Sequence, residues 1–166
     1  QLQVEQDNGA RVQIVTDESW KTHVGPVTTD SVYRGEIYDA RMETPGWDRV
    51  EFNDSGWNPA LVVTPPAGVL SAQMMPPIRV VDTLVPLKMT NPSAGAYVFD
   101  MGQNFSGWAK LRVQGPRGTR VRMRYSELIF ENGTLNTDTT RRAQPIDIYI
   151  LKGENEEEYE PKFSYL

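Results

Sequence analysis

Val121-Arg122-Met123-Arg124-Tyr125 decides the fold class more directly than any other stretch of the sequence. Successive side chains of a β-strand point to opposite faces, so its apolar residues share one face and its arginines share the other. Asp147-Ile148-Tyr149-Ile150-Leu151 alternates in the same way. Short stretches with this period indicate strands that turn one face to a core.

The rest of the chain has the same character. The 13 Gly and 12 Pro residues are spread along all 166 positions, and no long stretch has a helical period. Leu2–Glu5 and Val12–Val15 flank Asn8-Gly9, a pair that favours a tight hairpin turn. Glu154–Glu158 is expected to form a solvated acidic turn. Further strands are expected at Val32–Tyr38, Ala96–Phe99, Gly107–Gln114 and Glu158–Leu166.

A proline-rich segment, residues 63–77, interrupts this series of strands. Pro65, Pro66, Pro76 and Pro77 cannot donate to a strand ladder, so we expect a connection there rather than a strand. We predict an all-β, jelly-roll β-sandwich of two antiparallel sheets that spans residues 1–166 as a single module. Two contiguous pieces remain the alternative. Because the chain opens on Gln1 and ends inside an expected strand, we interpret it as a truncated fragment.

Composition excludes several classes of function. There is no cysteine, which rules out disulfides and thiolate metal sites. His23 is the only histidine, so a multi-histidine metal site is ruled out as well. The formal net charge of -5 argues against a nucleic-acid partner, which requires a basic face. No apolar run approaches the roughly 20 residues of a membrane span.

Four segments carry a family resemblance when taken in order. They are Gly35–Arg41, Gly46-Trp47 with Phe52–Ala60, Phe99–Trp108, and Asp147–Gly153 with Tyr159–Phe163. Together they resemble the N-terminal β-sandwich region of bacterial α-L-rhamnosidases, and the resemblance covers nearly the whole chain. In that family a separate helical barrel performs the hydrolysis. The resemblance therefore implies a non-catalytic fragment of an enzyme, with no catalytic residue and no required cofactor.

The resemblance also implies partners. These are the catalytic barrel of the same polypeptide and a rhamnose-containing glycan or glycoside from which the parent enzyme removes terminal α-L-rhamnose. A periplasmic or secreted parent fits the resemblance, but the sequence itself leaves the compartment open. Linkage, aglycone and oligomeric state are open as well.

Three charged residues at one strand end are candidates for holding a sugar. Asp39 and Arg41 stand two apart and are expected to point to one side, whereas Glu36 points to the other. Asp39 is a candidate acceptor for sugar hydroxyls, and Arg41 is a candidate donor to a neighbouring oxygen. The alternative interpretation is an Asp–Arg pair that holds a strand to a loop, and for Glu36 this structural interpretation is favoured.

Asp39 is also a candidate calcium ligand, because a related module of the family binds rhamnose through calcium. Calcium takes six to eight oxygen ligands. In that module an Asn follows the residue that matches Asp39, whereas here the next residue is Ala40, which offers no side-chain oxygen. This departure argues against calcium.

The remaining candidates are amides and tryptophans. The Asn104 side chain can donate and accept hydrogen bonds at once, which suits sugar hydroxyls, whereas for Gln103 a structural role is favoured. Trp47 and Trp108 are candidate stacking platforms, and core packing is the alternative. We favour a carbohydrate-binding or substrate-presenting module. The competing hypothesis is a purely structural domain in which these residues brace the sandwich.

Overall fold

The computed structural model describes residues 2–69, 71–138, 143 and 145–162, and its regular structure is almost entirely strand. The chain divides into two compact units. The first unit comprises Gln1–Val24 and Thr44–Pro76, and the second comprises Gly25–Glu43 and Pro77–Leu166. The all-β prediction is confirmed. Among the described residues, no helix is long and apolar enough to cross a membrane.

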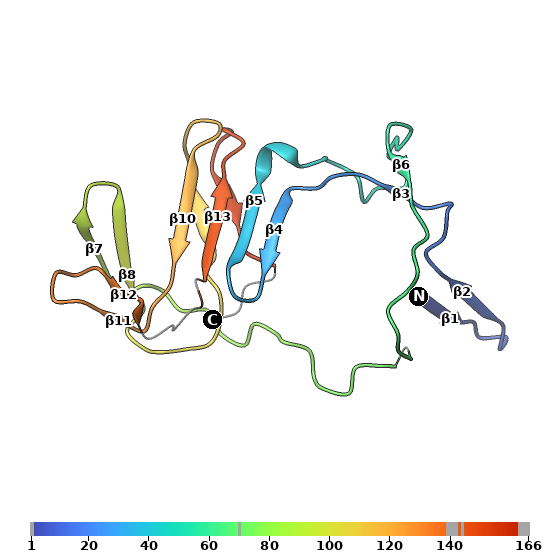
Figure 1. Ribbon diagram of the computed structural model, residues 1–166, viewed down its shortest axis with the longest axis horizontal. Coiled ribbons are helices and arrows are strands. Elements are labelled where there is room, and N and C mark those ends of the chain that lie inside the picture. The colour runs from blue at the N-terminus through green and yellow to red at the C-terminus, as the bar shows by residue number, and fades with distance from the viewer. Residues whose placement is uncertain (1, 70, 139–142, 144, 163–166) are drawn as a thin grey trace. The chain divides into compact units, whose positions relative to one another are not determined.

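The first unit contains two small antiparallel pairs. β1 (Leu2–Glu5) and β2 (Arg11–Ile14) form the predicted hairpin, which places Leu2 opposite Ile14 and Val4 opposite Val12 (Figure 1). Gly9 supplies the positive φ angle of 79° that the turn requires. β3 (Lys21–Thr22) pairs with β6 (Asn58–Pro59).

The second unit is built on a four-stranded sheet with the order β10-β13-β5-β4. Its strands are β4 (Val27–Ser31), β5 (Gly35–Asp39), β10 (Arg120–Arg124) and β13 (Ile146–Ile150). The β10–β13 and β4–β5 pairs are antiparallel, whereas β5 and β13 run parallel although about 110 residues separate them in the sequence. Figure 1 shows the four strands side by side.

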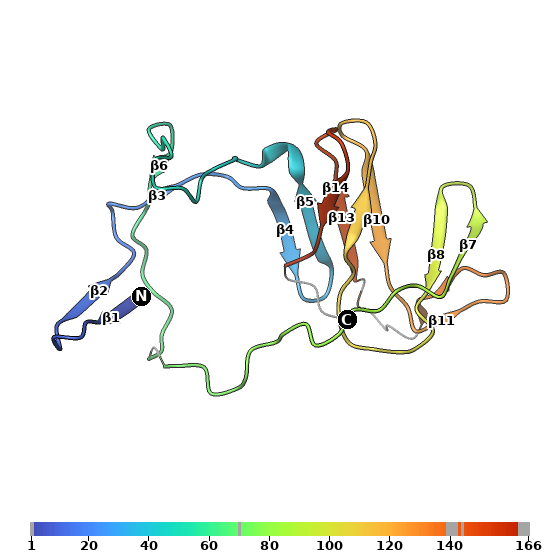
Figure 2. The same cartoon turned by 180° about the vertical axis from the view of Figure 1, so that it is seen from behind.

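The core of the second unit lies between this sheet and a strand pair. β9 (Leu111–Val113) and β14 (Glu157–Tyr159) form that pair. Seen from behind, β14 stands in front of β13 (Figure 2). Tyr149, Leu151 and Tyr159 are buried together, and partly buried side chains of Leu111, Val113, Val121 and Met123 pack against them. The face of β10 that carries Val121 and Met123 is therefore the core face, as the alternation predicts.

Two further hairpins belong to the second unit. β7 (Lys88–Ser93) pairs with β8 (Ala96–Asp100), and β11 (Leu128–Ile129) pairs with β12 (Leu135–Asn136). The described residues of the proline-rich segment contain no strand, and one of the three points at which the chain passes between the units falls inside it, at Pro76–Pro77. A single sandwich over residues 1–166 stays a prediction.

Several local expectations require correction. Val32, Tyr33 and Arg34 form an exposed turn between β4 and β5 instead of continuing a strand. The strand expected at Gly107–Gln114 is confined to Leu111–Val113. Glu157, expected in a solvated turn, is buried in β14. Of the strand expected at Glu158–Leu166, the part from residue 163 onward lies outside the described residues.

Candidate functional site

Asp39 and Arg41 meet as an ion pair at the end of β5. Asp39 caps a one-turn 3-10 helix, η1 (Ala40–Met42), and its Oδ1 accepts hydrogen bonds from the backbone N of Arg41 at 3.1 Å and from Nε at 2.8 Å. Oδ2 accepts from Nη2 at 2.7 Å, which completes a bidentate contact. The turn of η1 brings the two side chains together, because Arg41 lies beyond the strand on which the alternation was read.

The pair presents a guanidinium to solvent and not a carboxylate. The Asp39 side chain is nearly buried, whereas that of Arg41 is 40% exposed. The hydrogen bond from Arg41 holds the pKa of Asp39 below its ordinary value, so the carboxylate stays charged. A Cβ added to Gly118 would lie 3.4 Å from Nη1 of Arg41, so the loop before β10 runs close to the guanidinium. Asp39 therefore orients Arg41, and Arg41 is the group that can reach a ligand.

These residues do not fit a calcium ion in the observed arrangement. Both carboxylate oxygens of Asp39 already accept from Arg41, and the guanidinium puts positive charge where a cation would sit. Ala40 adds no ligand. Over the described part of the chain, no three His, Asp or Glu residues are grouped closely enough to hold a metal.

Glu36 is sealed inside the second unit. Its side chain is fully buried, and its two oxygens accept from the Tyr159 hydroxyl at 2.9 Å and the backbone N of Lys162 at 3.0 Å. The backbone N of Glu36 donates to Oδ1 of Asp147 at 2.9 Å, and Oδ2 of Asp147 accepts from the Tyr125 hydroxyl at 2.8 Å. Glu36 as a sugar ligand does not agree with this burial, because its carboxylate does not reach solvent.

Another buried carboxylate, that of Glu157, binds the turn between β13 and β14. Oε2 of Glu157 accepts from the Tyr149 hydroxyl at 2.8 Å and the backbone N of Lys152 at 3.0 Å, and Oε1 accepts from the backbone N of Gly153 at 2.9 Å. Desolvation raises the pKa of Glu157, but these hydrogen bonds outweigh it and leave the pKa below its ordinary value.

Tyrosine rings connect these carboxylates through the core. Tyr149 stacks on Tyr159 with ring centroids 4.8 Å apart, and Tyr38 lies 5.4 Å from Tyr159. The Tyr38 hydroxyl donates to Glu43 at 3.0 Å. Sequence reasoning missed this network. The alternation that places Asp147 and Tyr149 on one face of β13 was the available signal, but it does not name their partners.

Asn104 and Trp108 both belong to the second unit. Asn104 is exposed in the loop after β8. Trp108 is partly buried, and its Nε1 donates to Oε1 of Glu160 at 2.5 Å. Of the predicted site residues in the second unit, the structure therefore joins Asp39 with Arg41, and it ties the Trp108 indole to Glu160.

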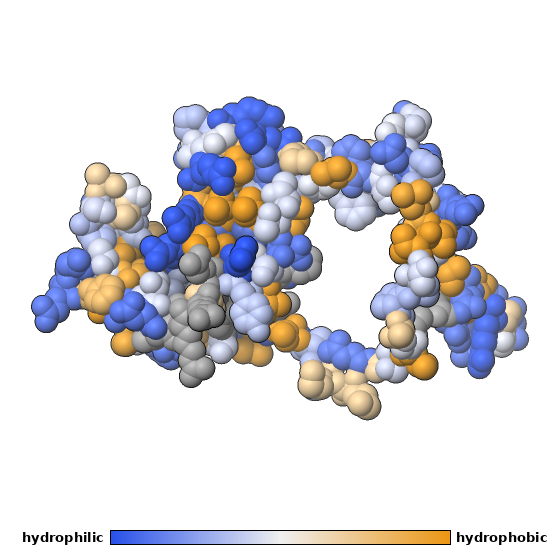
Figure 3. Space-filling view, in the orientation of Figure 1, coloured by the Kyte–Doolittle hydropathy of each residue, from blue (hydrophilic) through white to orange (hydrophobic). Residues whose placement is uncertain are grey.

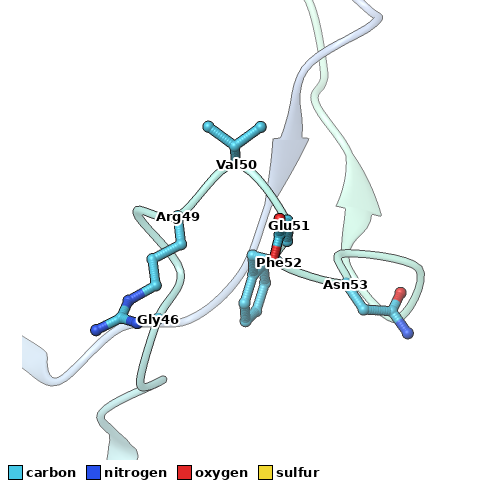
Figure 4. Close-up of a pocket in the computed structure, with 6 residues that line it drawn as sticks. All are labelled: Gly46, Arg49, Val50, Glu51, Phe52 and Asn53. Carbon is cyan, nitrogen blue, oxygen red and sulfur yellow. The ribbon is translucent and has the colours of Figure 1, made fainter.

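Trp47 belongs to the first unit and stands 63% exposed in a turn. Beside it an open hollow of about 610 Å³ is lined by Gly46, Arg49, Val50, Glu51, Phe52 and Asn53. In Figure 4, Arg49 and Asn53 point in opposite directions, and Val50 is fully exposed. The polar groups do not converge, so the hollow is not a formed binding site. Trp57 instead packs against His23 and Phe52.

Comparisons with known families cover both parts of the chain. The profile of the α-L-rhamnosidase N-terminal domain matches residues 1–82, and the profile of the bacterial α-L-rhamnosidase concanavalin-like domain matches residues 90–166. The first match includes Gly25–Glu43, whose strands β4 and β5 lie in the sheet of the second unit. The family boundary and the boundary of the folded units therefore differ.

Individual relatives agree with the profiles. An α-L-rhamnosidase of Streptomyces avermitilis is 39% identical over 99% of this chain, and one of Formosa agariphila is 33% identical over 99%. The chain spans 16% and 18% of their lengths. A solved α-L-rhamnosidase from Dictyoglumus thermophilum superposes with a TM-score of 0.91 at 48% identity, covering 98% of this chain and 18% of that one. The Streptomyces avermitilis enzyme complexed with L-rhamnose superposes with a TM-score of 0.91 at 37% identity, covering 98% and 16%.

Proposed function

The chain belongs to the bacterial α-L-rhamnosidase family, and from this premise we propose that it serves a longer enzyme as a non-catalytic structural module. That enzyme would hydrolyse terminal α-L-rhamnose from glycans or glycosides. The module would support the catalytic barrel of the same polypeptide. This chain spans 16–18% of the length of its curated relatives. In an enzyme of that length, the catalytic region would lie in the rest of the polypeptide.

One observation carries the structural role. The buried carboxylates accept hydrogen bonds from within the chain, and the partners of Glu36 lie 123 and 126 residues away in the sequence. Buried polar groups that are fully satisfied fix one arrangement of a core. Leaving such a buried carboxylate unpaired would cost much of the free energy of folding. These residues therefore indicate a rigid scaffold and not a site that opens to a ligand. A jelly-roll topology for this scaffold is part of the same proposal.

The second candidate function is sugar holding at Arg41, as a carbohydrate-binding module. It is favoured by the half-exposed guanidinium, whose Nη1 makes no hydrogen bond to the described residues. A positioned arginine donates well to hydroxyl oxygens. Asn104 and Trp47 would contribute only if a glycan reached them. Such binding would be weak, with a Kd in the micromolar to millimolar range, roughly, because one sugar offers few contacts.

A titration with L-rhamnose tests the two roles. Tryptophan fluorescence and backbone amide shifts are followed up to high millimolar sugar, with and without calcium. The structural role predicts no saturable change in either series. A saturable change that is lost in Arg41→Gln would support sugar holding and overturn the structural role. The chain is also expected to release no product from an aryl α-L-rhamnoside, because the proposed role places the pair of catalytic carboxylates in the rest of the polypeptide.

A further inference from the structure

A row of three arginines follows the outer face of β10. Arg120, Arg122 and Arg124 alternate with the core-facing residues Val121 and Met123, and all three are exposed. Residues two apart on a strand are separated by about 7 Å. The row therefore places positive charges at regular intervals along one edge of the four-stranded sheet, on the side away from β9 and β14.

An isoleucine strip lies beside the row. The register pairs the three arginines with Ile150, Ile148 and Ile146 of β13, and Ile148 in turn with Ile37 of β5. In the space-filling view, hydrophilic side chains lie over β10 and hydrophobic ones over the neighbouring strands (Figure 3). The isoleucines are buried or partly buried, so the strip offers little free apolar area.

The row has no internal counter-charge among the described residues. Arg11, Lys21, Arg41, Lys110, Arg112 and Lys152 each contact a carboxylate. No hydrogen bond or ion pair is made by the side chains of Arg120, Arg122 or Arg124 to any described residue. Within the described sheet, Asp39 is the only carboxylate that the strand register places on this face. Its carboxylate is already paired with Arg41.

We propose that the arginine row, Arg120, Arg122 and Arg124, binds a glycan that carries carboxylate groups. The planar guanidinium fork matches a carboxylate in a bidentate contact. Like charges aligned on one strand repel each other, and an anionic ligand relieves that cost. The chain as a whole carries a net charge of -5, so this face is opposite in sign to its surroundings and is where a polyanion would be attracted.

A glycan fits this face better than a folded protein does. The core of a protein interface is apolar and depleted of charged residues, whereas here the exposed groups are arginines and the isoleucine strip is largely covered. An extended, charged surface suits a flexible charged polymer. The choice of a glycan over an acidic peptide rests on the proposed function, because a rhamnosidase works on rhamnose-bearing glycans and glycosides.

The test measures binding of oligogalacturonate to the full chain by calorimetry at low salt. Neutral dextran and poly-L-glutamate of matched length are the comparison ligands. The variant Arg120→Gln/Arg122→Gln/Arg124→Gln takes the net charge from -5 to -8. The control variant Arg11→Gln/Arg49→Gln/Arg79→Gln makes the same change in charge at exposed arginines elsewhere. A third variant, Arg120→Lys/Arg122→Lys/Arg124→Lys, keeps the charge but removes the planar guanidinium fork.

Saturable binding of oligogalacturonate that weakens with salt is expected, with no binding of dextran. The affinity should fall about tenfold or more in the glutamine variant, fall by less in the lysine variant, and change less than about twofold in the control. Thermal melts check that each variant is folded.

Three results would overturn the proposal. One is an absence of saturable binding, which would leave the row as a guard of an edge strand. Another is an equal loss in the control variant. The last is binding of poly-L-glutamate alone, or self-association of the unmodified chain that the glutamine variant abolishes, either of which would assign the row to a protein partner. None of these results bears on the L-rhamnose titration, so failure of this proposal and failure of the proposed function are distinguishable.

Discussion

Three buried carboxylates in the second unit are each held by a tyrosine hydroxyl. Glu36 accepts from Tyr159, Asp147 from Tyr125, and Glu157 from Tyr149. Burial and the neighbouring carboxylate raise the pKa of each of the three tyrosines, so the hydroxyls remain protonated donors. A neutral hydroxyl stabilises a buried carboxylate less than a cation would. Backbone amides therefore add a second hydrogen bond, from Glu36 to Asp147 and from Lys162 to Glu36.

The Tyr159→Phe variant tests the contact between Tyr159 and Glu36, whose partners are farther apart in the sequence than those of the other two contacts. It removes the hydroxyl donor and leaves one oxygen of the fully buried Glu36 unpaired, so the free energy of unfolding should fall by about 1–3 kcal/mol. Urea unfolding followed by circular dichroism measures the change. Tyr97→Phe is the matched control, because Tyr97 is exposed on β8, and it should change the value by less than about 0.5 kcal/mol. Equal effects of the two variants would contradict the assignment.

Glu157 predicts how stability depends on pH. Its pKa in the folded chain lies below the ordinary value of 4.5, so the unfolded chain binds more protons as the pH drops through this range. The stability that Glu157 contributes should be fully present above about pH 4.5 and should be lost as the pH falls through the folded-state pKa. Thermal midpoints measured from pH 7 downward should therefore fall less steeply in Glu157→Gln. A parallel pH dependence in that variant would refute the role of Glu157.

At the scale of elements, one close approach fixes how β4 and β5 join β13. Gly35 begins β5 with a φ angle of 79°, and a Cβ at this position would lie 2.3 Å from the carbonyl O of Ile146. Only a residue without a side chain lets the two backbones come this close at the start of the parallel pair. The glycine thus decides the register in which Ile37 meets Ile148.

Substitution of two glycines with alanine separates the cost of a left-handed backbone from the cost of a steric clash. Gly35 and Gly9 have the same φ angle of 79°, but nothing lies within 4 Å of a Cβ at Gly9. Gly9→Ala should cost about 1–2 kcal/mol of unfolding free energy, the penalty of a left-handed backbone for alanine. Gly35→Ala should cost about 3 kcal/mol or more, because the backbone must also move. Similar losses in urea unfolding would show that the approach to Ile146 does not limit the fold.

At the scale of the whole molecule, the family boundary does not coincide with a folding boundary. Residues 25–43 lie inside the first family match, yet they supply two of the four strands of the sheet to which β10 and β13 belong. They also supply Glu36, and Glu43, which binds Lys152 at 3.1 Å. A break between residues 82 and 90 would therefore remove half of the central sheet from the second unit.

Two shortened chains test this claim. A chain of residues 83–166 should lack cooperative thermal unfolding and exchange its amide hydrogens rapidly, because Tyr149 and Tyr159 lose the strands that cover them. A chain of residues 25–166 keeps both hydrogen-bonded neighbours of β13 and should retain protection in β10 and β13. Protected amides in the shorter chain would show that the second family region folds without β4 and β5.

Local patterns in the sequence were sufficient to predict the fold class and the positions of individual strands. The alternation over residues 121–125 and 147–151 predicted both strands, because the side-chain period of a strand is a local property. It predicted the core face of β10 correctly. In β13 the isoleucines share the outer face with the arginines, and Asp147 and Tyr149 face the core instead. Asn8-Gly9 named a hairpin for the same reason. Asp39 and Arg41 were identified as a pair, although η1, and not strand alternation, joins them.

Tertiary structure alone decided the pairing of strands distant in sequence and the role of the buried acids. Nothing in the residues around Glu36 shows that Tyr159 and Lys162 lie against it, because both approach through space from the other end of the chain. The parallel pairing of β5 with β13 is hidden for the same reason. Alternation fixes which face a side chain takes, whereas the partner on that face depends on how the whole chain returns to it.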